Sequence, residues 1–106
     1  MPDIEQVNEE PTAESTILTA VKTALHITDD DLDDELNAYI SEALEDMRRV
    51  GVTAAVDDTD SPLVIGCVVL YVKWMESYLG EPERFQKHYE RLRDSLSMGS
   101  DYNAEG

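Results

Sequence analysis

The sequence lacks most of the features on which catalytic and metal-binding sites depend. It has a single cysteine, Cys67, which excludes an intramolecular disulfide and a multi-cysteine metal site. It has two histidines, His26 and His88, and neither lies near Cys67 in the sequence, so this thiol has no adjacent base there. Its five glycines are scattered singly, without a glycine-rich phosphate loop. We therefore expect neither an enzyme nor a bound cofactor.

Basic residues are also scarce. Eight lysines and arginines stand against 24 acids, for a net charge of −16, and residues 1–60 hold 17 of the acids with only 3 bases. This balance argues against a nucleic-acid-binding surface and against docking on anionic lipid, because both need a basic surface. Most of the acids are expected to form a solvated face, and a high-salt cytoplasm in a halophilic host is a second explanation.

Long hydrophobic runs are absent. The longest apolar run, Leu63 to Val72, spans ten residues and ends at Lys73, which is too short to cross a bilayer. The N-terminus is acidic and has no hydrophobic segment, so no signal peptide is expected. These features predict a protein that is made in the cytoplasm and has no contact with a membrane.

The apolar residues that are present recur at helical spacing. The pattern predicts one small all-α domain, a bundle of about four helices, with its helical part in residues 14–98. Residues 1–13 should form a disordered acidic arm, residues 51–61 one long loop, and residues 99–106 a flexible tail. The expected helices span residues 15–27, 29–50, 62–79 and 82–97.

Capping residues and helix breakers place these boundaries. Thr28 is the expected N-cap of the second helix, and Gly51 the residue that ends it. Ser61 and Pro62 fit the start of the third helix, and Gly80 its end. The third segment, LVIGCVVLYV, is rich in β-branched residues and could form a buried strand. About 18 residues follow Pro62 before the turn, however, and this length favours a helix.

An acidic run precedes the second helix and invites comparison with a calcium loop. An EF-hand that begins at Asp29 would need glycine at its sixth position and glutamate at its twelfth, where the sequence has Asp34 and Ile40. The motif fails, so we expect no metal site. The run is interpreted as a charged helix start that forms an acidic solvent face: Asp29, Asp30, Asp31, Asp33 and Asp34.

Five aromatic residues bracket the predicted turn between the last two helices. One interpretation is that they hold this helical hairpin together. The other is that one edge of the set is a contact surface, since tyrosine and tryptophan are enriched at interface anchors. Both interpretations can be true of different residues among Tyr71, Trp74, Tyr78, Phe85 and Tyr89.

Three segments in this order resemble a known family. They are the helical segment ISEALEDMRRVGV with the acidic loop after it, the apolar hairpin PLVIGCVVLYVKWMESYLGEPERFQKHYERLRDSL, and the tail MGSDY. Over residues 15–102 the chain is similar to the small head–tail connector (adaptor) proteins of tailed viruses of bacteria and archaea. Its acidity exceeds what is typical of that family and fits a virus of a halophilic host.

The resemblance implies a structural virion protein at the neck of the particle. Family members form a ring, twelve-fold in the expected case, between the portal and the stopper or tail proteins. Genomic DNA passes through such a ring without specific binding. The acidic face of Asp29 to Asp34 would then line the channel, as the alternative to facing solvent, and let the DNA slide. The predicted subunit or portal contacts lie on the third and fourth helices and the tail: Tyr71, Trp74, Tyr78, Phe85, Tyr89, Met98 and Tyr102.

Two rival functions remain open at the level of the sequence. A small acidic regulator, either an inhibitor that mimics nucleic-acid charge or an antitoxin-like partner, would share the small size and the acidity. It predicts a tight complex with a basic protein in place of a self-assembled ring. A helical protein that buffers metal or catalyses hydrolysis is the weaker alternative.

Overall fold

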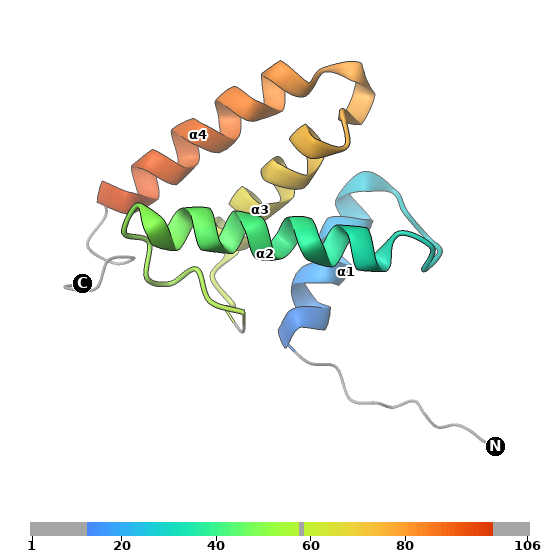
Figure 1. Ribbon diagram of the computed structural model, residues 1–106, viewed down its shortest axis with the longest axis horizontal. Helices are drawn as coiled ribbons and strands as arrows, with labels where there is room; N and C mark the ends of the chain where they lie inside the picture. The colour runs from blue at the N-terminus through green and yellow to red at the C-terminus, as the bar shows by residue number, and fades with distance from the viewer. Residues whose placement is uncertain (1–12, 58, 99–106) are drawn as a thin grey trace.

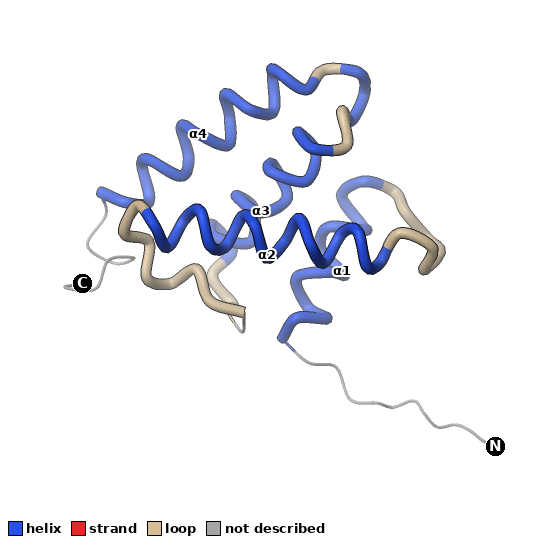
Figure 2. Tube along the Cα trace, in the orientation of Figure 1, coloured by secondary structure: helices blue, strands red, loops and turns tan. Residues whose placement is uncertain are grey.

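All four predicted helices are present in the computed structural model, which describes residues 13–57 and 59–98 (Figures 1 and 2). No strand occurs within these residues, so the strand alternative for the third segment is wrong. The predicted tail lies outside the described residues, as does the predicted arm except for Ala13, which already belongs to the first helix. The helices are α1 (Ala13–Leu25), α2 (Asp33–Arg49), α3 (Pro62–Met75) and α4 (Pro82–Met98).

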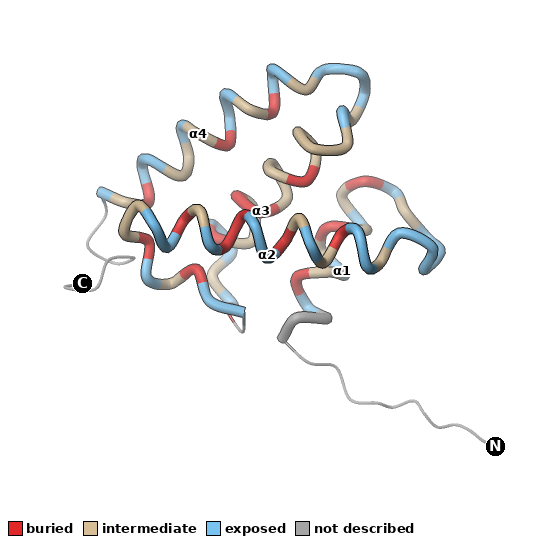
Figure 3. Tube along the Cα trace, in the orientation of Figure 1, coloured by how far each residue is buried: buried red, intermediate tan, exposed pale blue. Residues whose placement is uncertain are grey.

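The apolar helix α3 lies at the centre and packs against each of the other three. It forms an antiparallel hairpin with α4, which α2 crosses, while α1 packs against α2 and α3 (Figure 1). Buried positions of all four helices face this centre (Figure 3). The thiol of Cys67 is fully buried there, and burial raises its pKa to about 12, so the prediction that it is a core residue is confirmed.

The helix α2 begins at Asp33, four residues later than predicted, and Thr28 does not cap it. The carboxylate of Asp29 instead accepts a hydrogen bond from the backbone N–H of Asp31 at 3.1 Å. Such a local bond competes with helix formation and holds residues 29–32 in a turn. Lys22 of α1 fixes this turn against α2 through ion pairs with Asp30 at 3.0 Å and Asp33 at 2.7 Å.

The start of α3 is confirmed, but its predicted end is wrong. The Ser61 hydroxyl accepts a hydrogen bond from the N–H of Val64 at 3.3 Å, as an N-cap should. The helix then ends at Met75, because the backbone of Ser77 turns into the left-handed region at φ 51°. A short 3₁₀ turn, η2 (Tyr78–Gly80), connects it to α4.

The loop after α2 is packed against the bundle. Val52 and Ala55 are fully buried, and the Arg48 guanidinium donates a hydrogen bond to the carbonyl of Ala55 at 2.6 Å. The Thr59 side chain is buried and accepts a hydrogen bond from the N–H of Ser61 at 3.1 Å. Through these contacts the described part of the loop packs as an ordered part of the bundle.

Candidate functional site

The predicted aromatic contact set divides into a core group and a surface group. Tyr89 of α4 is buried, and its ring lies 5.1 Å from that of Tyr71 and 6.1 Å from that of Trp74 on α3. Phe85 is also buried and lies 6.1 Å from the ring of Tyr78. Edge and tilted ring contacts of this kind stabilise the packing of two helices. Tyr89 and Phe85 therefore hold the α3–α4 hairpin together within the chain.

An ion-pair network on α2 fixes the position of Tyr89. The Tyr89 hydroxyl donates to Asp46 Oδ2 at 2.7 Å, and Arg93 Nη1 donates to the same oxygen at 2.9 Å. Arg49 pairs with the other carboxylate oxygen. Burial raises the pKa of Asp46, but these three hydrogen bonds outweigh it and hold that pKa below its ordinary value. Asp46 thus ties α4 to α2.

The tip of the hairpin carries the exposed part of the set. Leu79 is 68% exposed and has a left-handed backbone at φ 58°, which is strained for a leucine. Tyr78 is half-buried beside it, and Lys73 Nζ lies 5.1 Å from the centre of the Tyr78 ring. At the far end of α4, Met98 is 83% exposed.

The other predicted contacts are only partly accessible. Tyr71 and Trp74 are half-buried, and their rings meet edge to face at 5.5 Å. The Tyr71 hydroxyl donates to Glu42 at 2.9 Å. Burial, followed by this hydrogen bond to Glu42, raises the pKa of Tyr71 to about 12. Tyr102 lies outside the described residues.

The acidic residues that were predicted to form one face lie around the turn before α2. Asp29, Asp30, Asp31 and Asp34 are exposed, and Asp33 is half-buried by its pairing with Lys22. This turn and α4 lie on different edges of the bundle (Figure 1). The structure therefore separates an acidic edge from the edge that carries the exposed arginines and lysine of α4.

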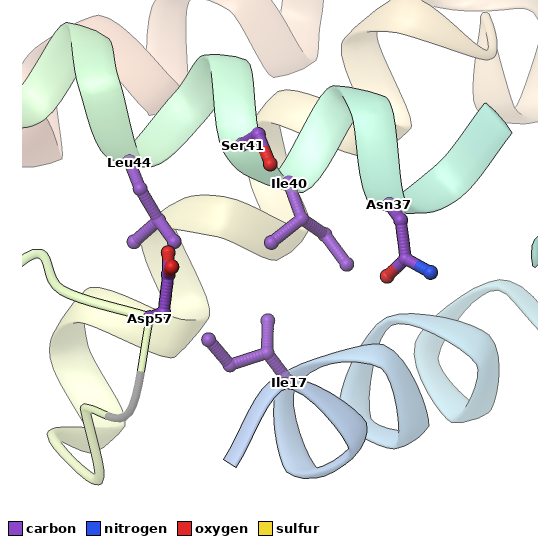
Figure 4. Close-up of a pocket in the computed structure, with 6 residues that line it drawn as sticks. All are labelled: Ile17, Asn37, Ile40, Ser41, Leu44 and Asp57. Atoms are coloured by element: carbon purple, nitrogen blue, oxygen red, sulfur yellow. The ribbon is translucent and has the colours of Figure 1, made fainter. Parts of the chain in front are cut away.

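A small pocket opens between α1, α2 and the loop after α2 (Figure 4). Its volume is about 70 Å³, far below the roughly 300–1,000 Å³ of pockets that bind small organic ligands. Three aliphatic and three polar side chains line it: Ile17, Ile40, Leu44, Asn37, Ser41 and Asp57. This cavity has room for the end of a side chain and none for a metabolite.

The titratable residues form no candidate metal centre in the part of the chain that the structure describes. There, no group of three or more histidine, cysteine or acidic residues is arranged to hold a metal ion. His26 and His88 are both exposed. No helix among residues 13–57 and 59–98 is both long and apolar enough to span a membrane.

Several residues that matter in the structure were not predicted. Leu79 was assigned to the third helix, although its position directly before Gly80 and Pro82 indicates a turn. Neither the Asp46–Arg93 ion pair nor the pocket could be predicted from a sequence pattern. Each joins residues that are far apart in the sequence.

Comparison with known proteins identifies the family. No curated protein and no solved structure matches the chain significantly. The model of the phage connector protein family, however, matches residues 17–103, which include the described residues from Ile17 to Met98. Membership implies a structural component of the virion that contacts other virion proteins. The chain belongs to the phage connector protein family, as its resemblance to head–tail connectors predicted.

Proposed function

We propose that this protein is a subunit of the head–tail connector, forming a ring between the portal and the stopper or tail proteins and lining the genome channel. The observation that carries the proposal is the family match over residues 17–103. A ring of twelve copies at the neck of the virion is the form that the resemblance implies. The net charge of −16 favours the alternative of an acidic regulator, but no family match supports that alternative.

The exposed part of the hairpin is the proposed contact surface for portal or neighbouring subunits. Its residues are Tyr78 and Leu79 at the tip, the accessible edges of Tyr71 and Trp74, and Met98 at the end of α4. A leucine that is exposed on a strained backbone gains nothing within the monomer. Burial against a partner would supply the missing apolar contact. We extend this proposal to Tyr102 and the rest of the tail, which would contact the portal.

The exposed aspartates before α2 are proposed to face the channel or the solvent. Their charge would repel the phosphates of DNA that passes through the ring, so the genome would slide without binding. Replacing Asp29, Asp30, Asp31, Asp33 and Asp34 with asparagine should therefore slow genome ejection. Unchanged ejection from particles that carry this variant would remove the channel role.

The test of the ring is the mass of the purified protein by light scattering, with negative-stain images, at high protein concentration in dilute and in molar salt. Closed rings of about a dozen subunits are expected, because a heterologous contact with the right rotation closes on itself. Molar salt should favour them if the acidity is an adaptation to a halophilic host.

The contact surface is tested by Leu79→Ser, with Leu32→Ser as the matched control, since both leucines are exposed. Leu79→Ser should reduce assembly, or binding to the portal, at least tenfold while circular dichroism and thermal unfolding stay unchanged. Equal assembly by the two variants would show that the hairpin tip is the wrong surface. A stable complex with a basic nucleic-acid enzyme, in place of rings or portal binding, would favour the acidic regulator.

A further inference from the structure

The pocket between α1, α2 and the following loop contains an acceptor without a donor. The oxygen Oδ1 of Asn37 is buried and has no hydrogen-bond partner among the described residues. Native structures rarely leave a buried polar atom in this state, so such an atom indicates a missing partner. Figure 4 shows the Asn37 side chain directed away from α2 toward α1 at one end of the pocket.

The remaining walls define the chemistry of that partner. Ile17, Ile40 and Leu44 offer an apolar floor, while the Ser41 hydroxyl and the Asp57 carboxylate add two further oxygen acceptors. A side chain with an apolar stem and a head that only donates hydrogen bonds matches both the apolar floor and the oxygen acceptors. Lysine and arginine have this composition. The volume of about 70 Å³ suits the end of one such side chain.

The chain presents matching side chains on α4. Arg84, Lys87 and Arg91 are exposed and spaced by three and four residues, so they form one stripe along the helix. Arg84 already pairs with Glu81 at 2.8 Å. Lys87 and Arg91 have no ion pair with any residue that the structure describes. The helix α4, which carries them, lies on a different edge of the bundle from α1, so another copy is the donor that fits (Figure 1).

We propose that the pocket of one subunit receives Lys87 or Arg91 from α4 of a second copy of this chain. The contact joins two different surfaces, and such a head-to-tail contact is the kind that generates rings. The inference rests on the proposed ring and names the lateral contact within it. Copies that each carry a charge of −16 repel one another, so an ion pair between Asp57 and a cation of α4 gives their contact a local attraction.

Chemical cross-linking tests the pairing directly. Ser41→Cys places a thiol at the pocket, and His88→Cys places one beside Lys87; both positions are exposed. Native Cys67 is fully buried and stays in place. A mixture of the two variants, treated with a short bismaleimide at high protein concentration, should give linked dimers, and neither variant alone should do so. No dimer in the mixture, or equal dimer from a single variant, would overturn the contact.

Charge reversal adds a second readout. Lys87→Glu combined with Arg91→Glu, introduced into the His88→Cys chain, should lower the yield of linked dimer at least tenfold. Asp57→Lys in the Ser41→Cys partner should then restore part of it. Thr23→Glu combined with Ala38→Glu is the control, because both residues are exposed on other helices and their replacement changes the charge in the same direction. An equal loss with this control would show a general effect of charge and overturn the pairing.

The two proposals fail in different ways. If negative stain shows rings but the mixed variants do not cross-link, the pocket contact is wrong and the ring stands. If the mixed variants link and no ring forms, even with portal present, the contact stands and the ring function is wrong.

Discussion

Glu76, the residue after α3, lies close to Glu35 of α2, and a proton held between the two carboxyl groups makes the stability of the bundle depend on pH. The oxygen Oε2 of Glu76 is buried and has no hydrogen-bond partner among the described residues, because two ionised carboxylates have no donor to offer each other. The bond to Glu35, then burial, then the charge of Glu35 raise the pKa of Glu76 to about 7. Glu76→Gln replaces the proton by an amide donor that is present at every pH.

The sign and size of the effect follow from this pKa. Between its ordinary pKa of 4.5 and about 7, Glu76 binds more proton in the folded than in the unfolded chain. The free energy of unfolding therefore falls as the pH rises through that window. At 1.36 kcal/mol per pH unit the upper bound is about 3.4 kcal/mol. Glu76 is half-buried, and screening by water lowers the expected gain of Glu76→Gln to about 1–2 kcal/mol at pH 8.

Urea unfolding followed by circular dichroism at pH 5 and pH 8 measures the effect. The gain of Glu76→Gln over the parent protein should be about 1–2 kcal/mol at pH 8 and much smaller at pH 5. Glu45→Gln is the control, since Glu45 is an exposed acid of α2 and loses the same charge. If both variants gain equally at pH 8, general repulsion explains the result and the shared proton does not exist.

Three further substitutions test the packing by urea unfolding at neutral pH. Asp46→Ala should cost about 2–3 kcal/mol, because it leaves the Tyr89 hydroxyl and Arg93 without their acceptor, and a loss below 0.5 kcal/mol would contradict the network. Gly66→Ala should stabilise α3 by about 0.5–1 kcal/mol, because an added Cβ meets no atom within 4 Å; a destabilised variant would show that the space is not free. Leu79→Gly should stabilise the monomer by about 1 kcal/mol, because it relieves the backbone strain, and it should also weaken assembly. If neither the stability nor the assembly changes, Leu79 is not a contact residue.

The helices could be predicted from the sequence, since their pattern depends on spacing within each segment. Ser61 and Pro62 mark the start of α3 through local chemistry, and the structure places the cap there. The end of α3 could not be predicted in this way. The turn at Ser77 brings Tyr78 against Phe85 of the next helix, and that gain comes from tertiary packing. The start of α2 was missed because the Asp29 side chain bonds the backbone of Asp31.

The candidate surfaces were harder to predict than the helices. The sequence names the aromatic residues around the turn, but their burial decides which of them are accessible, and burial depends on tertiary packing. Asp46 lies 43 residues from Tyr89 in sequence and fixes its orientation. The pocket unites Ile17 with Asp57 only because the loop after α2 packs back on the bundle. No periodicity within one segment carries that information.

The net charge constrains how such subunits can assemble. At physiological ionic strength charges interact over about 8 Å, so exposed acids of neighbouring subunits in the proposed ring would repel one another. Charges in a partly buried contact are screened less than exposed ones. Added salt would therefore remove more of the general repulsion than of the proposed attraction between Asp57 and a cation of α4. A chain with a charge of −16 that exposes Lys87 and Arg91 on α4 can thus remain monomeric in dilute buffer and still associate in a defined orientation when salt rises.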